Sequence, residues 1–419
     1  MTLSGKFLSA VVFTGVLLFP GCTETKVPVA AAPAENTVET VRTITIIAAG
    51  DNLIHDIIYN AARVSGDEET FDFTPNYAQI KPIIEKADIA FVNQETVMGG
   101  KQIGYSGYPV FNTPQDAGIG LINAGFDVIN QASNHVMDRG EKAVTGTMDF
   151  WESRGVPYLG VFRSEEARKT EKRIIEKNGI KTGFLSYTYG LNGFALPRDK
   201  PWLVGLIDKE VMGREIDELR PLCDLLVVSM HWGNEFQHTE SDAQRDLARF
   251  MALHKVDLIL GHHPHVTQPV DVIDRPDGGK LVVYYSLGDF VSHTQSDWTP
   301  DTITGALAYV RVRKTQLKGE TSCTIVLAGI IPTVCHYGRE RRSPFIVYPL
   351  WAYTDELASK HYKAKMTLEY LNAAAQKVFG IRVMDRESYE RTLLLDRGDA
   401  QPQRCPQRIA ADQFDGRAN

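Results

Sequence analysis

Apolar, β-branched runs alternate with amphipathic stretches through most of the chain, and each run ends abruptly in polar residues. The strand-like runs are Thr43–Ala49, Ile89–Val92, Val128–Ile129, Leu225–Met230, Leu258–Leu260 and Leu281–Leu287. Between them, apolar residues recur at helical spacing in Tyr77–Lys86, Asp116–Ala124, Glu141–Ser153, Lys209–Leu219 and Asp242–His254. Continuous apolar strands that alternate with helices are buried on both faces, so the pattern predicts an α/β fold.

Beyond residue 300 the strand-like runs become longer and no helical pattern separates them. The runs Ala306–Val312, Thr324–Ile331 and Phe345–Tyr353 predict antiparallel strands that complete a second sheet. The segment Met366–Phe379 has the spacing of one amphipathic helix, and Gln401–Asn419 predicts a frayed tail. We therefore expect a folded body over residues 43–355, followed by a C-terminal helix and tail over 356–419.

The N-terminal segment has the character of a secretion signal. Lys6 precedes thirteen uncharged residues, Phe7–Phe19, whereas a membrane-spanning helix needs about 20. Gly21-Cys22 at its end resembles a bacterial lipoprotein signal, in which cleavage precedes Cys22 and that cysteine carries the lipid. An ordinary cleaved signal with an incidental cysteine is the alternative. We expect a signal peptide over 1–21, a flexible tether over 22–42, and a mature chain anchored outside the cytoplasm.

Composition excludes several classes of protein. The chain is 43% hydrophobic and 23% charged, which is typical of globular proteins and unlike a disordered chain or a multispan membrane protein. With 45 Lys+Arg against 52 Asp+Glu, the net charge of −7 argues against nucleic-acid binding. Five cysteines without a CxxC pair exclude a disulfide scaffold and a thiolate zinc site. Cys323 and Cys335 are expected either to form a disulfide or to be free buried thiols.

Polar clusters stand where the predicted strands end, which is the edge that forms the functional crevice of an α/β fold. Their chemically useful side chains are Asp51, His55, Asn93, Glu95, Asn134, His135, Asp138, His231, Trp232, Glu235, His262, His263, His265 and Asp289. Six of the eleven histidines fall in these clusters. Carboxylate, amide and imidazole groups suit manganese, iron or zinc. One cluster alone is explained as a helix cap or a core histidine, but several at one sheet edge predict a two-metal hydrolytic site.

The order Asp, Asn-x-Glu, Asn-His, His and His-x-His resembles the calcineurin-like metallophosphoesterases. The local forms resemble the CapA family of capsule or poly-γ-glutamate synthesis proteins, namely GDxxxH at Asp51–His55, NxE at Asn93–Glu95, GFDVINQASNHVMDRG at Gly125–Gly140, HWGNE at His231–Glu235 and GHHPHVTQP at Gly261–Pro269. The resemblance runs from Thr43 to His293 and implies a sandwich of two mixed β-sheets flanked by helices. The chain departs from it at Asp289, where we expect Asn, and at Asn112, where we expect Arg.

The resemblance also implies a role for each residue. Asp51, Glu95 and His265 would hold one of two divalent metal ions, and Asn134, His231 and His263 the other, with Glu95 bridging. His135 would be the general acid, oriented by Asp138. The residues expected to add ligands or to support them are His55, Asn93, His262 and Asp289; on an extended backbone only His263 and His265 would face one site. Candidate substrate contacts are Trp232, Glu235 and Tyr108, although core packing explains the aromatic residues nearly as well.

These roles imply a metal-dependent hydrolase of capsule or poly-γ-glutamate synthesis at the cell envelope, acting on a phosphoester or related bond. One alternative is a non-catalytic assembly or anchoring component whose metal site shapes a binding surface. Another is an extracytoplasmic phosphodiesterase or nucleotidase, which the absence of Arg at Asn112 disfavours. His135 favours catalysis, because a structural metal site needs no acid beside it. Expected partners are an anionic polymer or phosphoester substrate and membrane-bound capsule synthase components. His254, His336 and His361 are expected at the surface.

Overall fold

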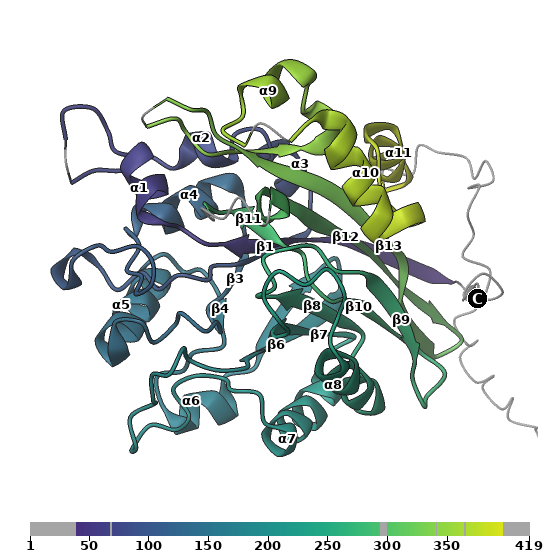
Figure 1. Ribbon diagram of the computed structural model, residues 1–419. Helices are drawn as coiled ribbons and strands as arrows, with labels where there is room; N and C mark the ends of the chain where they lie inside the picture. The colour runs from purple at the N-terminus through teal and green to yellow at the C-terminus, as the bar shows by residue number, and fades with distance from the viewer. Residues whose placement is uncertain (1–38, 68, 294–299, 341, 364–365, 397–419) are drawn as a thin grey trace, which may run out of the picture.

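The computed structural model describes residues 39–67, 69–293, 300–340, 342–363 and 366–396. In this part of the chain two mixed β-sheets pack face to face, and helices cover both outer faces (Figure 1). The predicted α/β sandwich of two mixed sheets is therefore confirmed. The predicted signal peptide, the lipid site at Cys22, most of the tether and the predicted C-terminal tail lie outside the described residues.

The first sheet has the strand order β14-β13-β12-β1-β2-β3-β4, with β11 beside β1. Its strands are β1 (Thr40–Asn52), β2 (Ile89–Asn93), β3 (Val128–Asn130), β4 (Tyr158–Leu159), β11 (Asp289–Val291), β12 (Thr304–Leu317), β13 (Glu320–His336) and β14 (Ile346–Pro349). Strands β1 to β4 run parallel, and β12 pairs antiparallel with β1 from Thr40 onward. This pairing starts β1 three residues earlier than predicted. It also places β12–β14 in the first sheet, so the prediction that they complete a second sheet is wrong.

The second sheet has the order β5-β6-β7-β8-β10-β9. Its strands are β5 (Arg173–Lys177), β6 (Ile180–Thr188), β7 (Leu225–His231), β8 (Leu258–His262), β9 (Val270–Asp274) and β10 (Lys280–Tyr284). Strands β6, β7, β8 and β10 are parallel, and the antiparallel strands β5 and β9 form its edges. The carboxyl ends of β7 and β8 point to the same end of the sandwich as those of β1 and β2 (Figure 1).

The helices of the described residues are α1 (Asp56–Ala61), α2 (Thr74–Tyr77), α3 (Lys81–Ile84), α4 (Asp116–Ala124), α5 (Gly140–Ser153), α6 (Glu165–Thr170), α7 (Lys209–Leu219), α8 (Asp242–Leu253), α9 (Asp355–Lys360), α10 (Leu368–Phe379) and α11 (Arg386–Asp396). Single 3₁₀ turns are η1 (Lys101–Ile103), η2 (Arg220–Leu222), η3 (Pro300–Ile303), η4 (Leu350–Ala352) and η5 (Gly380–Arg382). The helix predicted over Tyr77–Lys86 is instead split into α2 and α3. Pro75 and Pro82 each occupy a first turn, the helical position that tolerates proline.

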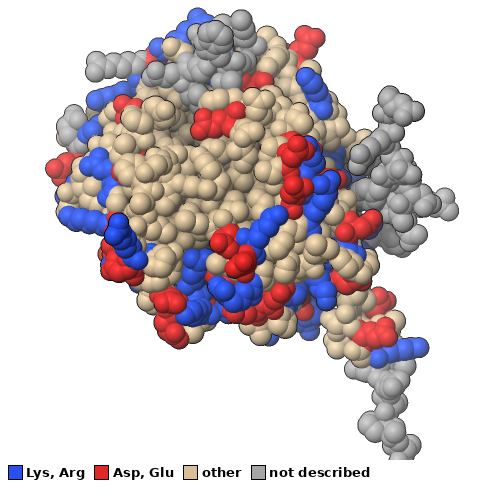
Figure 2. Space-filling model, turned by 60° about the horizontal axis from the view of Figure 1, so that its bottom comes forward, with Lys and Arg blue, Asp and Glu red and all other residues tan. Residues whose placement is uncertain are grey.

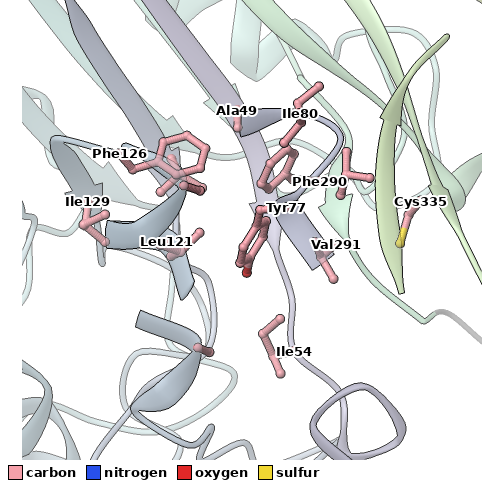
Figure 3. Close-up of a cluster of buried hydrophobic side chains, with 14 of the residues drawn as sticks. Ala49, Ile54, Tyr77, Ile80, Leu121, Phe126, Ile129, Phe290, Val291 and Cys335 are labelled. Atoms are coloured by element: carbon pink, nitrogen blue, oxygen red, sulfur yellow. The ribbon is translucent and has the colours of Figure 1, made fainter. Parts of the chain in front are cut away.

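Apolar side chains fill three layers: one between the sheets, one under the helices of the first sheet and one under α7 and α8. Figure 3 shows part of the layer under the first sheet, where Tyr77 stacks on Phe290 at 5.7 Å between ring centroids. Full burial of such a side chain contributes roughly 1.5–3 kcal/mol. The Tyr77 hydroxyl donates to Asn52 Oδ1 at 3.0 Å. The apolar layer therefore ends directly below the polar strand ends.

Two predictions about individual side chains are corrected. Cys323 and Cys335 both lie in β13, twelve residues apart. Because a strand rises about 3.3 Å per residue, they cannot pair, and both are free thiols. His361 is completely buried rather than at the surface, and its Nε2 lies 3.1 Å from the carbonyl oxygen of Cys335. His254 and His336 are partly exposed.

Among the described helices, none combines the length and the apolar character that crossing a bilayer requires.

Candidate metal centre

The two sheets bring their polar strand ends together at one end of the sandwich. Asp51 ends β1, Glu95 follows β2 and Asn134 follows β3, all in the first sheet. From the second sheet, His231 ends β7 and His263 follows β8. All five side chains are buried. His231 Nε2 lies 2.9 Å from Asn134 Oδ1, so the two sheets meet directly at this point.

One group of potential ligands consists of Glu95, His231 and His263. Their nitrogen and oxygen atoms lie within 4.8 Å of one another. Asn134 joins this group through its contact with His231. The structure thus brings together the residues predicted for one metal ion.

A second group consists of Asp51, His265 and Asp289, again within 4.8 Å. Asp289 stands beside Asp51 because β11 pairs in parallel with β1 in that register. His265 Nδ1 is 2.9 Å from Asp289 Oδ1 and 3.4 Å from Asp51 Oδ2. Asp289, which the sequence left open as a ligand or a supporting residue, therefore lies within a group of potential ligands.

Glu95 lies between the two groups. Its Oε1 is 3.7 Å from His231 Nε2 and 3.8 Å from His265 Nε2. One carboxylate oxygen therefore lies at a similar distance from an imidazole of each group.

The buried polar atoms of the site fit bound cations. Those that make no hydrogen bond within the described residues are both oxygens of Glu95, Nδ1 of His231, Nδ1 of His263, both ring nitrogens of His262 and Oδ2 of Asp289. Leaving a buried donor or acceptor unpaired costs about 1–3 kcal/mol, and more for a charged group. Lone pairs of carboxylates and imidazoles that converge without partners are suited to divalent metals.

The electrostatics of the site reflect close packing of ionisable groups. Burial, reinforced by the charges of Asp51 and Asp289, raises the pKa of Glu95 well above its ordinary value. Burial likewise raises the pKa of Asp289 to about 6. Burial acts to raise the pKa of Asp51 too, but the neighbouring imidazoles of His262 and His265, each 3.4 Å away, outweigh it and hold that pKa well below its usual range. A cation beside Glu95 would favour its charged form.

The pKa values of the histidines in the centre are shifted in opposite directions. Burial lowers the pKa of His231 well below its ordinary value and that of His263 to about 3, so both are neutral imidazoles, the form that ligates metals. Burial acts to lower the pKa of His265 as well, but the neighbouring charges of Glu95 and Asp289 raise it well above 6.5.

The backbone of the His262–His265 segment is not extended, so the alternation argument for its side chains was wrong. His263 has φ +98° and His265 has φ +58°, both in the left-handed region. Such conformations cost about 1–3 kcal/mol each and gather at functional sites. Here they turn both imidazoles into the centre, while the His263 N–H donates to Asp51 Oδ2 at 3.1 Å. His262 also reaches the centre, with its Nδ1 3.4 Å from Asp51 Oδ1.

A relay of side-chain amides holds Asp51. Asn93 Nδ2 donates to Asp51 Oδ1 at 2.7 Å, and Asn93 Oδ1 accepts from Asn130 Nδ2 at 2.7 Å. Ser186 of the second sheet donates in turn to Asn130 Oδ1. Because both ends of the Asn93 amide are used, Asn93 orients Asp51 rather than facing the two ligand groups.

His55 stands apart from both ligand groups. Its ring packs edge-on against Phe111 at 5.3 Å, and its Nδ1 lies 3.4 Å from the backbone nitrogen of His293. The burial of the imidazole lowers its pKa to about 3. His55, four residues after Asp51 in the sequence, therefore lies beyond the two ligand groups.

His135 and Asp138 form a buried pair at the rim of the centre. His135 Nδ1 is 2.8 Å from Asp138 Oδ2, which also accepts the Phe111 N–H at 2.8 Å. The Phe111 ring packs edge-on against the imidazole at 4.7 Å. These contacts fix the imidazole plane beside Asn134.

Trp232 is not a substrate contact. It is 1% exposed, packs in the core under α8, and its Nε1–H donates to the Tyr285 carbonyl at 3.0 Å. The side chain points to the helix side of β7 because it alternates with His231. Asn112 is structural as well: it accepts from Gly99 N at 2.8 Å and donates to the Gly100 and Gly104 carbonyls.

Glu235 and Tyr108, two of the predicted substrate contacts, are exposed side chains at the edge of the centre, which is called its mouth below. Glu235 is exposed, and its carboxylate lies within 4.8 Å of His263 and His265. Tyr108 is 74% exposed, and its ring lies 6.3 Å from that of Phe111.

Sequence reasoning missed two residues of the loop after β6. Tyr189 is half exposed, and its ring lies 4.5 Å from that of His263. Asn192 is exposed, accepts from Asn134 Nδ2 at 3.2 Å and lies 3.3 Å from His135 Nδ1. The stretch Gly190–Gly193 has the composition of an ordinary turn, so no sequence signal marked either side chain.

The fold and this strand-end centre define an α/β protein of the two-sheet class with a polar site of carboxylates and imidazoles. The chain belongs to the family described as bacterial capsule synthesis protein PGA_cap, whose family model matches residues 45–294. This match confirms the resemblance drawn from the motifs.

Curated relatives agree with the family. The chain is 33% identical over 172 residues to the PGA biosynthesis protein CapA of Bacillus subtilis (strain 168), covering 41% of this chain and 44% of that protein. It is 33% identical over 175 residues to the capsule biosynthesis protein CapA of Bacillus anthracis, covering 40% of each. The matches thus span less than half the length of either relative.

Solved structures with a similar arrangement include the NAD nucleotidase NadN of Haemophilus influenzae, with TM-score 0.43 and 12% identity over 86% of this chain and 67% of that one. Another is a 5'-nucleotidase precursor of Thermus thermophilus, with TM-score 0.41 and 15% identity over 80% of this chain and 59% of that one.

Proposed function

We propose that this protein is a metal-dependent hydrolase of capsule or poly-γ-glutamate synthesis at the cell envelope, acting on a phosphoester or related bond. The family and the names of the two Bacillus relatives support the process. The observation that carries the chemistry is Glu95, a buried carboxylate that makes no hydrogen bond to the described residues and lies between two groups of ligand atoms.

The residues present fit a pair of divalent cations, manganese, iron or zinc. Asp51, His265 and Asp289 would hold one, Asn134, His231 and His263 the other, and Glu95 would bridge them. When bound, such a pair supplies Lewis acidity and lowers the pKa of water toward about 7.

The remaining chemistry belongs to side chains of the chain itself. His135 holds a proton for the leaving oxygen of the substrate, and Asp138 keeps the Nδ1 edge of the ring occupied so that Nε2 is the edge left to donate. Phe111 excludes water from one side of the imidazole. Tyr108 and Glu235, at the mouth, contact the parts of the substrate that extend beyond the reacting bond.

Lipid on Cys22 would tether the protein to the envelope, close to membrane-bound capsule synthase components and to the polymer. On the face in Figure 2, Lys and Arg stand among Asp and Glu rather than in a separate basic stripe. That face therefore lacks the basic stripe that typically follows a nucleic-acid backbone.

The test combines metal analysis with an activity screen. Purified full-length protein should contain about two divalent ions per chain, and it should hydrolyse phosphomonoesters, phosphodiesters or poly-γ-glutamate in a way that chelation abolishes. Metal without hydrolysis of any of these, together with lost polymer assembly in cells when the ligands are removed, would favour the non-catalytic assembly component. Efficient turnover of nucleotides alone would favour the nucleotidase alternative.

A further inference from the structure

We propose that Asn192 is a positioning residue that fixes the orientation of the Asn134 side-chain amide toward the metal centre. This inference rests on the proposed metal centre and adds a residue that neither the motifs nor the family match assigns. Asn192 comes from the loop after β6, whereas Asn134 follows β3 in the other sheet.

The two ends of the Asn134 amide face different neighbours. Its Oδ1 is 2.9 Å from His231 Nε2, so it points into the group formed by Glu95, His231 and His263. Its Nδ2 points the other way and donates to Asn192 Oδ1 at 3.2 Å. Tyr189, three residues earlier in the same loop, places its ring 4.5 Å from that of His263. The loop after β6 therefore supplies a hydrogen-bond acceptor for the Asn134 amide through Asn192.

The orientation matters because only one end of an asparagine amide can bind a cation. Oδ1 carries lone pairs, while Nδ2 carries two hydrogens and no available lone pair. Rotation of the Asn134 amide by half a turn would aim N–H groups at the cation. A partner that accepts from Nδ2 penalises the rotated state, in the same way that outer hydrogen bonds orient metal-binding histidines.

The backbone at Asn192 shows that the local turn alone does not require this side chain. Asn192 has φ +49° and the next residue, Gly193, has φ +82°. Glycine adopts the left-handed conformation with less strain than asparagine. Asn192→Gly would therefore keep the turn and remove only the amide. The same amide lies 3.3 Å and 3.4 Å from the two ring nitrogens of His135, which also places it beside the proposed acid.

The experiment titrates metal-free full-length protein with Mn²⁺ or Zn²⁺ and follows binding by calorimetry, without any substrate. Asn192→Gly should weaken the affinity by about 10–100-fold, the usual cost of removing a residue that supports a ligand. Asn178→Gly is the matched control, because Asn178 is also left-handed at φ +46°, lies at the opposite end of β6 and donates to the Thr43 carbonyl.

A double-mutant cycle separates positioning from a general loss of structure. If Asn192 acts through Asn134, Asn192→Gly should have no further effect on affinity in an Asn134→Ala background. Full additivity would overturn the proposal, as would equal affinity of wild type and Asn192→Gly. A wild-type chain that binds neither ion would instead refute the metal centre, and the role of Asn192 with it.

Discussion

Replacement of His135 by alanine tests the step that separates an enzyme from a binding protein. The His135 side chain is 8% exposed and is held by Asp138 at 2.8 Å, so alanine removes an oriented proton donor. It leaves the two groups of ligand atoms untouched. His135→Ala should therefore retain the metals and lose rate.

The expected loss of rate in His135→Ala follows from the role of His135 as a general acid. A positioned general acid contributes about 10²–10⁴-fold to rate. At 1.36 kcal/mol per tenfold change, this is about 2.7–5.4 kcal/mol of transition-state stabilisation. Asp138→Asn should cost less, because an asparagine oxygen can still accept from His135 Nδ1 but lacks the charge that stabilises the protonated ring.

The assay compares aryl phosphoesters whose phenol leaving groups differ in acidity. His135→Ala should lose the full factor on a poor leaving group and far less on a good one, which needs no proton. His254→Ala is the matched control: its Nδ1 is 2.8 Å from Asp217, but the pair lies at the end of α8.

Three results would refute the reasoning. Loss of metal from His135→Ala would make the residue a ligand. Equal losses on good and poor leaving groups would exclude protonation of the leaving oxygen. Unchanged polymer assembly in cells, with metals retained, would favour the binding component.

Further predictions concern metal content, packing, pH dependence and anchoring. His231→Ala and His263→Ala should each lower bound metal, and full wild-type content by elemental analysis would contradict the ligand assignment. Trp232→Ala should cost about 3–5 kcal/mol of unfolding free energy with no change in KM, since the indole is a core side chain. Burial lowers the pKa of His55 to about 3, so below pH 6.5 the unfolded chain binds a proton at this imidazole and the folded chain does not. The free energy of unfolding should therefore fall as pH falls from 6.5 toward 3, by about 1 kcal/mol per pH unit from this group. His55→Gln should reduce the difference between the urea unfolding midpoints measured at pH 7 and pH 5. Mass spectrometry of membrane-extracted protein should find lipid on an N-terminal Cys22, and a soluble product that begins elsewhere would contradict it.

The fold was predictable where one periodic pattern dominated. Helices α4 and α7 have the predicted bounds, and the strands of both sheets that carry the centre were found from their continuous apolar runs. Strand β4, with two residues, is too short to leave a pattern. The sheet that contains β12–β14 was predicted wrongly, because β12 pairs with β1, which is far away in sequence, and the hydrophobic pattern of a strand does not show which sheet it joins.

The site was predictable where it depends on strand ends. Asp51, Glu95, His231 and His263 follow buried strands directly, so parallel pairing alone brings them to one edge. Asn192 and Tyr189 could not be found in this way. Their positions depend on the path of a loop and on a left-handed backbone conformation.

The ligand atoms alone do not distinguish catalysis from metal-stabilised binding, because both uses need the same buried carboxylates and imidazoles. Asp138 bears on the choice between these two uses. Its side chain is fully buried, and its Oδ1 makes no hydrogen bond within the described residues. An incompletely paired buried carboxylate opposes folding, and Asp138 is not in either ligand group. Its structural contacts are the Phe111 N–H and His135 Nδ1. We therefore expect the pair to serve the proposed acid role of His135, and the comparison of good and poor leaving groups is the measurement that separates this role from a purely structural one.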